Sequence, residues 1–411
     1  MTRLPFALVF AGTACAQAYV DKLPPEHPGI RYLERPLKDR ASKLARELET
    51  GGVRLTSRTD GSGYLASLLE HLDVTVDSQA LVFSKTSFQA ANVSPRNPRA
   101  IYFSDDVAVG FVRGGRGIEV AAIDPVAGAV FYRLDDSPSG APRLIRQTEC
   151  LTCHQGAATL GVPGLFVGSV FPNLMGTPSP SGAIVTDHRT PFAERWGGWY
   201  VTGTHGNQRH RGNAVAENPA EPEALETEGA QNLTSLAGRF PPAGYLSATS
   251  DLVALMTFEH QTQMNNFIVR VGWLERQGIP PSGREIDDLV AYLTFAEEAP
   301  LREPVHGVSQ FTQSFPQRGP RDSHGRSLRD FDLEHRLFRY PLSYLIYSAA
   351  FDALPDRLRE RIYSRLFEVL SGRDQSPRFS WAGEPERRAA LEILRETKPN
   401  LPASFGSIQV R

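Results

Sequence analysis

The chain has 411 residues, of which 41% are hydrophobic and 22% are charged, and its formal net charge is −2. It can therefore bury a real core, and its length predicts two or three units or one large unit with insertions. Neither a basic stripe nor an acidic tail occurs, so nothing points to nucleic acid or to an anionic membrane surface as a partner.

Residues 1–18 have the features of a secretory signal peptide. Arg3 gives a positive start, residues 4–14 are mostly apolar, and residues 16–18 form a small-x-small cleavage site. The apolar run is too short to span a bilayer, and no later stretch is long enough either. We therefore expect periplasmic export without a transmembrane segment in the mature chain. The alternative is a lipid anchor at Cys15, but the bulky aliphatic residue usual three positions before a lipidated cysteine is missing.

Two helices and then a series of short strands are expected before residue 150. Leucines at helical spacing predict helices over 36–49 and 62–73. Short β-prone runs separated by turn-forming pairs follow at 100–103, 107–112, 118–122 and 129–134. This pattern predicts an antiparallel meander that leads directly into a cysteine motif.

The second half of the chain is expected to be mainly helical. Residues 155–205 are rich in Gly, Pro and aromatic residues, which predicts loops, and 213–230 have almost no large apolar side chains, which predicts a flexible insertion. Asp251 and Ser282 are plausible N-caps of the first two long helices. Helical spacing predicts helices over 250–276, 283–298, 332–352, 354–371 and near 385–396.

These patterns predict an α+β fold, β-rich before the motif and α-helical towards the C-terminus. We expect, in chain order, a signal peptide (1–18), a helical N-terminal segment (19–79), a β-rich region with the motif and Gly/aromatic loops (80–212), a flexible insertion (213–249) and a helical region that completes a cofactor pocket (250–411).

The most informative motif is Cys150-Leu151-Thr152-Cys153-His154. The chain has three cysteines, and Cys15 is expected to leave with the signal peptide. Cys-x-x-Cys-His is the attachment signature of c-type haem. Two intervening residues let one helical turn bring both thiols to one edge of the porphyrin, while the histidine donates a ring nitrogen to the iron. We therefore expect one covalent haem c, with His154 as the proximal iron ligand.

Other uses of two cysteines three positions apart stay open. A structural zinc site usually needs four Cys or His ligands, and no second cysteine pair exists. A thioredoxin-like dithiol needs a strand-to-helix junction in a βαβ setting, whereas a β-meander is expected before Cys150. A plain disulfide between Cys150 and Cys153 is the remaining alternative in an oxidising compartment.

Through this motif the chain resembles the c-type cytochromes. Residues 171–176 are similar to the Gly-Pro-Asn-Leu-x-Gly loop of small cytochromes c, in which the proline carbonyl orients the proximal histidine. Phe171 replaces the first glycine, and Pro163 is the alternative. Residues 286–293 resemble the terminal helix of those cytochromes. More broadly, the chain resembles a group of uncharacterised exported bacterial cytochrome-like proteins, which implies no particular activity.

The sixth ligand of the iron is expected from one of two places. His260 and Met264 lie one turn apart on the apolar face of the helix predicted at 250–276, and His260 is the first candidate, with Met264 the weaker one. The alternative is a core histidine with a hydrogen-bonding partner and a methionine that fills the core.

A Gly/aromatic segment forms the second constellation. Trp196 and Trp199 suit a wall packed on a flat porphyrin, and His205 and His210 in the polar loop that follows are weaker candidates for the distal ligand or acid/base. A glycine-rich turn with surface histidines is the alternative. The remaining histidines lie in loops or among charged residues, and we expect them to be solvated.

Three functions are compatible with these residues. The first is a periplasmic electron-transfer cytochrome that exchanges electrons with a redox partner protein. The second is a haem oxidoreductase, peroxidase- or oxidase-like, acting on a small substrate, which the length of the chain favours. The third is a haem-based binding or sensing module.

Overall fold

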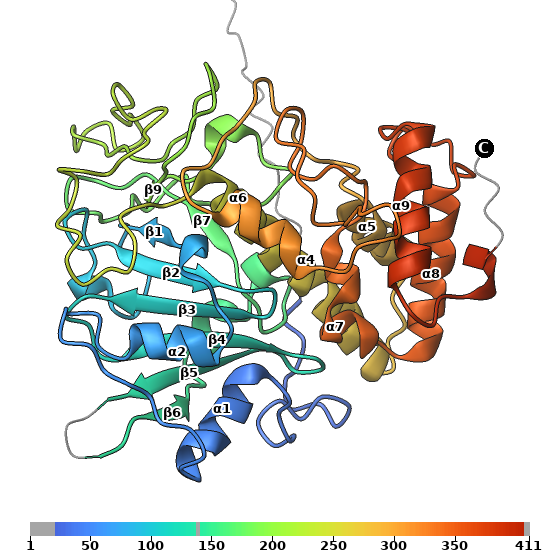
Figure 1. Ribbon diagram of the computed structural model, residues 1–411, viewed down its shortest axis with the longest axis horizontal. Helices are drawn as coiled ribbons and strands as arrows, with labels where there is room; N and C mark the ends of the chain where they lie inside the picture. Colours follow the sequence, from blue (N-terminus) through green and yellow to red (C-terminus); the bar gives the residue numbers. More distant parts are fainter. Residues whose placement is uncertain (1–20, 137–139, 407–411) are drawn as a thin grey trace, which may run out of the picture.

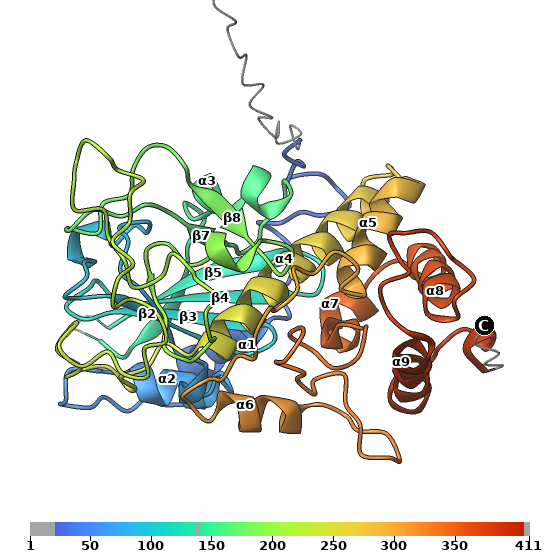
Figure 2. The same ribbon diagram turned by 90° about the horizontal axis from the view of Figure 1, so that it is seen from above.

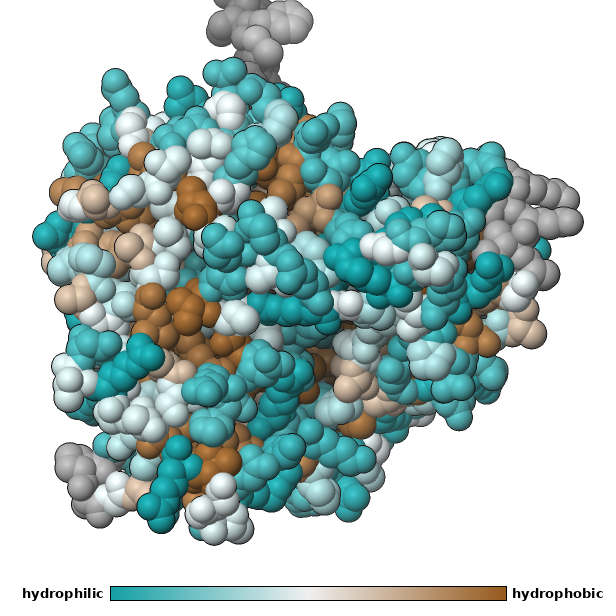
Figure 3. Space-filling view, viewed as in Figure 1, coloured by the Kyte–Doolittle hydropathy of each residue, from teal (hydrophilic) through white to brown (hydrophobic). Residues whose placement is uncertain are grey.

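The computed structural model describes residues 21–136 and 140–406. The signal peptide expected at residues 1–18 and the alternative lipid-anchor residue Cys15 lie outside these ranges. Within them, no helix has both the length and the apolar character that crossing a membrane requires. The face seen in Figure 3 is largely hydrophilic over the C-terminal helices, and its apolar residues gather over the half that carries the sheet.

The expected meander is confirmed as the centre of a seven-stranded antiparallel sheet with the order β6-β5-β4-β3-β2-β1-β9. Five consecutive strands pair as hairpins, and β1 and β9 extend the sheet at the β2 edge. The strands are β1 (Ala80–Val82), β2 (Arg99–Phe103), β3 (Val107–Val112), β4 (Ile118–Asp124), β5 (Gly128–Asp135), β6 (Arg143–Arg146) and β9 (Trp199–Tyr200).

Different elements cover the two faces of this sheet (Figures 1 and 2). Helices α1 (Arg40–Glu49) and α2 (Leu65–His71) pack on one face. On the other side lie the short α3 (Leu151–His154) and a hairpin of β7 (Val167–Ser169) and β8 (Ile184–Thr186). The cysteine motif is therefore on the side of the sheet that α1 and α2 leave free.

The long helix α4 (Leu252–Arg276) joins the sheet to the helical part of the molecule (Figure 2). Asp251 caps it as expected, because its carboxylate accepts hydrogen bonds from the backbone of Val253 and Ala254. Nearly every residue up to Leu274 is buried, which is typical of a helix enclosed on all sides. Next comes α5 (Gly283–Leu293), where Ser282 and Glu285 form a capping box.

The prediction of a long helix over 332–352 is wrong. Asp332 Oδ1 accepts backbone hydrogen bonds from Glu334, His335 and Arg336, and Phe331 bridges to Phe338, so the chain turns back on itself there. A short polar side chain that binds nearby N–H groups competes with the helix in this way. The helices of this part are α6 (Phe311–Ser314), α7 (Ala349–Asp352), α8 (Asp356–Leu370) and α9 (Glu384–Thr397).

Residues 213–249, expected as a flexible insertion, contain neither helix nor strand. Isolated bridges connect Ala216 to Asn173 and to Leu225. Phe240 is buried and stacks on Tyr200 of β9 at 5.7 Å between ring centroids. The segment is thus an irregular loop that packs on the edge of the sheet.

Candidate functional site

The Cys-x-x-Cys-His motif forms a single helical turn. The N–H of His154 donates to the carbonyl of Cys150 at 2.9 Å, which closes the turn. Cys150 is half-buried and Cys153 is exposed, and within the described part of the chain neither thiol forms a disulfide. Burial, together with the nearby charge of Glu149, raises the pKa of the Cys150 thiol to about 11. The turn therefore presents two thiols and an imidazole along one short stretch of surface.

The ring of His154 is held in one orientation. Its Nδ1 lies 3.0 Å from the carbonyl oxygen of Gly164. A carbonyl only accepts, so Nδ1 carries the proton and Nε2 keeps its lone pair. The ring also contacts Phe131 and Phe166, with centroids 4.9 and 5.4 Å away. Burial lowers the pKa of His154, which favours the neutral, ligand-competent imidazole.

Further contacts support the loop that carries the Gly164 carbonyl. Asn266 of α4 donates from Nδ2 to the carbonyl of Leu165 at 2.8 Å, and the N–H of Gly164 returns to the carbonyl of His154 at 2.9 Å. A Cβ at Gly164 would overlap the side chain of Asn266, so only glycine fits this close approach. Helix α4 thereby supports the loop that sets the ring orientation.

The structure shows which carbonyl plays this part. Pro172, in the loop that resembles the small-cytochrome signature, instead accepts a hydrogen bond from the backbone of Ala216. The acceptor for His154 is Gly164, the residue after the alternative Pro163. The similarity of residues 171–176 to the signature loop therefore does not carry over to that role.

An apolar surface borders the motif. Cys150 and Leu151 pack against Phe131 and Ala121, which lie on neighbouring strands of the sheet. Beyond them, a small cavity lies between the sheet and α4, and Leu165 is among the residues that line it. On this face Ile101 and Ile123 are only half-buried. Several of its other residues are small, namely Ala108, Gly110 and Ala121.

These features fit a covalently attached haem. A porphyrin is flat and apolar, so it gains from an apolar face that is partly exposed at Ile101 and Ile123. The two free thiols supply the attachment, and the orientation of His154 leaves the lone pair of Nε2 for iron. The hydrogen bond from Nδ1 to a backbone carbonyl is the usual partner of a metal-ligating histidine. When bound, haem supplies one-electron redox chemistry or a coordination site for a small ligand.

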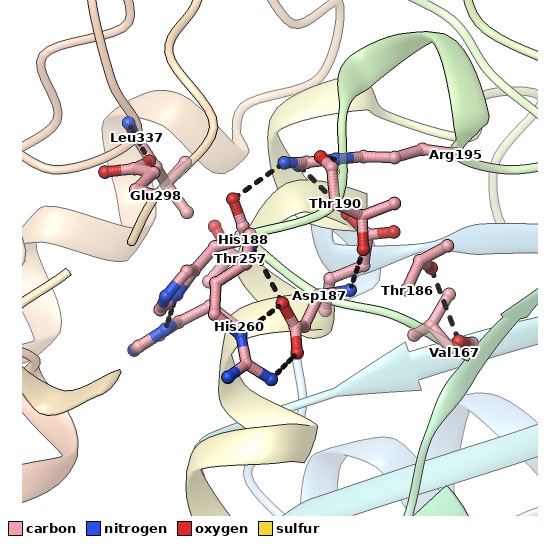
Figure 4. Close-up of polar contacts among 12 residues, drawn as sticks. Val167, Thr186, Asp187, His188, Thr190, Arg195, Thr257, His260, Glu298 and Leu337 are labelled. Atoms are coloured by element: carbon pink, nitrogen blue, oxygen red, sulfur yellow. Dashed lines mark hydrogen bonds and ion pairs between the residues drawn. The ribbon is translucent and has the colours of Figure 1, made fainter. Parts of the chain in front are cut away.

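His260 is fully buried in the core (Figure 4). Its Nε2 is 2.7 Å from Ser343 Oγ, and its Nδ1 is 2.8 Å from Nδ1 of His188. Burial lowers the pKa of both histidines well below the usual value, so the pair is neutral. Both ring nitrogens of His260 thus have partners within the chain. Met264, the other candidate on α4, is fully buried in the main hydrophobic cluster of the protein.

His188 was expected to be solvated, and this is wrong. It is 1% exposed and stacks on Tyr292 at 4.0 Å between ring centroids, while its Nε2 has no hydrogen-bond partner within residues 21–136 and 140–406. The loop that follows His188 carries Arg195, which forms a buried ion pair with Glu259 of α4 at 3.3 Å. His188 was missed because a loop position has no periodicity that reports burial.

The second constellation also lies inside the protein. His205 donates from Nδ1 to the carbonyl of Gln208 at 2.8 Å and accepts at Nε2 from the backbone of Asn232 at 3.1 Å. His210 Nδ1 accepts from the backbone of Gly212 at 3.0 Å. These histidines are therefore buried members of a folded loop rather than surface residues.

Trp196 and Trp199, the candidate haem wall, are both buried in the main hydrophobic cluster. Trp196 packs edge-on against His210 and Phe192. Trp199 donates from Nε1 to the carbonyl of Gly168 in β7 at 2.7 Å. In the structure, therefore, these two rings link the β9 edge of the sheet to the loops around them.

No family model, curated protein or solved structure matches this chain.

Proposed function

We propose that this chain is an exported c-type haem protein with one haem attached through Cys150 and Cys153 and with His154 as the axial iron ligand. The observation that carries the proposal is the hydrogen bond from His154 Nδ1 to Gly164, which leaves Nε2 as the free nitrogen. Phe131 and Phe166 hold the same ring in place. A zinc site at this turn has only three ligands from the motif and no second cysteine pair to complete it.

The role proposed first is one-electron transfer to a redox partner in the periplasm. A single covalent haem suits this role, and its attachment edge would lie near the surface, because Cys150 is half-buried and Cys153 is exposed. A haem edge close to the surface brings a docked partner within short range. Export rests on the features of residues 1–18, and attachment through thioethers retains the cofactor after export.

A second role is favoured by the partners of the candidate distal ligands. His260 and His205 each have both ring nitrogens engaged within the chain, and Met264 is enclosed in the core. To bind iron, either histidine would lose a buried hydrogen bond, which costs about 1–3 kcal/mol. An iron whose sixth position is not held by these residues binds small ligands, as in a haem oxidoreductase or a sensor.

The proposed cofactor is tested by producing the full chain with and without the cytochrome c maturation machinery. We expect an intact mass heavier by one haem and an absorption spectrum that survives acid-acetone extraction. A mature protein with a disulfide between Cys150 and Cys153, and no haem under the same conditions, would refute the proposal.

The ferric spectrum of His260→Ala distinguishes the two roles. Because His260 is bonded to His188 and Ser343, we expect the substitution to leave the spin state and the rate of cyanide binding unchanged. It should still lower the free energy of unfolding by about 1–3 kcal/mol, since a buried hydrogen-bonded group is lost. The measurements are optical spectra, stopped-flow cyanide binding and urea unfolding.

His205→Ala serves as a matched control, because it removes a buried imidazole with comparable hydrogen bonding from a loop outside α4. A wild-type protein that is low-spin and turns high-spin in His260→Ala would assign His260 to the iron. That result would favour the electron-carrier role over an open sixth position.

A further inference from the structure

An arginine lies on the sheet face beside the motif. Arg99 of β2 and Glu119 of β4 form an ion pair at 2.5 Å, and their side chains are 24% and 26% exposed. The strand between them has Gly110 opposite Glu119 in the register. A Cβ at this position would overlap the guanidinium, so Arg99 crosses β3 over a glycine to reach Glu119.

The Arg99 side chain is incompletely satisfied. Its Nε is buried and has no hydrogen-bond partner among the described residues. A guanidinium carries five N–H donors in a planar fork that matches a carboxylate through two parallel hydrogen bonds. The contact with Glu119 is made through Nη2. The other terminal nitrogen, Nη1, can therefore serve a second carboxylate together with the remaining N–H of Nη2.

The register of the sheet brings the pair close to the motif. Glu119 lies two residues before Ala121 on β4, so the two side chains are on the same face of the sheet. Cys150 and Leu151 pack against the hydrophobic cluster that contains Ala121. The buried Ala121 and the half-buried Ile101 lie on the face that carries Arg99.

Haem attached through its two vinyl-derived carbons still has two propionate carboxylates on the remaining edge. We infer that Arg99 binds one of these propionates with its guanidinium fork. This inference rests on the proposed haem and identifies the residue that anchors the edge not tied to cysteine. Glu119 then holds the guanidinium in place over Gly110, while the haem carboxylate satisfies donors that the chain leaves free.

The test compares Arg99→Ala and Arg99→Lys in the haem-loaded full chain. Haem content is measured first. Failed attachment would count against the proposed cofactor, and it is thereby distinguished from a failure of the inference about Arg99. The resonance Raman propionate-bending band is expected to shift in both variants, because lysine keeps the charge but cannot supply the bidentate fork. The exposed Arg143→Ala on β6 is the matched control and should leave the band unchanged.

The reduction potential supplies the second readout. Loss of the cation in Arg99→Ala should favour ferric over ferrous haem about tenfold, a fall of about 59 mV for a one-electron couple. Arg99→Lys should keep the ferric–ferrous equilibrium within about twofold of wild type, since one charge remains. An unshifted propionate band in either haem-loaded variant would overturn the inference. A change in reduction potential without a shift of the band would also overturn it, because Arg99 would then act only through its charge.

Discussion

The double variant Cys150→Ser/Cys153→Ser is expected to lose all covalently bound haem. Serine has no thiol, so neither thioether can form, although the helical turn of α3 remains possible. The measurements are the pyridine haemochrome absorbance after extraction and the intact mass of protein produced with the maturation machinery. Thr152→Ser is the matched control, because this exposed residue lies between the two cysteines and should retain one haem per chain.

His154→Ala tests the axial ligand separately from attachment. We expect an altered ferric spectrum that added imidazole restores, because the small ligand replaces the nitrogen removed from beneath the iron. The exposed His335→Ala should leave the spectrum as in wild type. Covalent haem that persists in the double cysteine variant, or a wild-type spectrum in His154→Ala, would contradict the proposed site.

The second large effect is expected on stability. Arg195→Ala should lower the free energy of unfolding by about 3–5 kcal/mol at pH 8, because it leaves the carboxylate of Glu259 buried without its counter-charge. The two side chains are 3% and 0% exposed, so water does not replace the lost partner. Oε1 of Glu259 already has no hydrogen-bond partner in the described structure.

The loss should be smaller at pH 5. Burial raises the pKa of Glu259 from 4.5 to about 7 even with Arg195 opposing it. A folded-state pKa above the unfolded value means that the folded chain takes up a proton as pH falls through this window, so its relative stability increases. Urea unfolding at both pH values measures this difference, and an equal loss at pH 5 and pH 8 would contradict the assigned charges.

Arg388→Ala provides the comparison for this variant. Arg388 pairs with Glu384 on the exposed side of α9, where the side chains are 51% and 49% exposed. An exposed pair contributes about 0.2–1 kcal/mol, so the expected change is small at either pH.

Local sequence signals predicted much of this fold. The meander from β2 to β5 was predicted from alternating short runs and turns, and the caps at Asp251 and Ser282 mark the observed starts of α4 and α5. Such signals lie within a few residues of the element they specify. The pairing of β1 with β9 was not predicted, because a two-residue strand has no periodicity of its own and depends on a distant partner.

The site divides in the same way. The five-residue motif can be recognised from the sequence because its spacing is that of one helical turn. The structure places its residues on such a turn. The partners of His154 at Gly164 and Asn266 come from packing between distant segments, and no local pattern indicates them. For His260 the apolar helical face indicated burial, but only the fold could place His188 and Ser343 against its ring nitrogens.

The support that Asn266 gives to the loop beside His154 also imposes an order of assembly. The two ends of the Asn266–Leu165 hydrogen bond are 101 positions apart, whereas the hairpins from β2 to β6 and the motif that follows form through short-range contacts. Long-range contacts form slowly because loop closure costs entropy before the contact is made. A chain synthesised from its N-terminus therefore exposes both thiols on a flexible turn well before α4 fixes the imidazole. In the proposed function, thioethers would therefore form early, and the final orientation of His154 would be set only after the chain has folded around it.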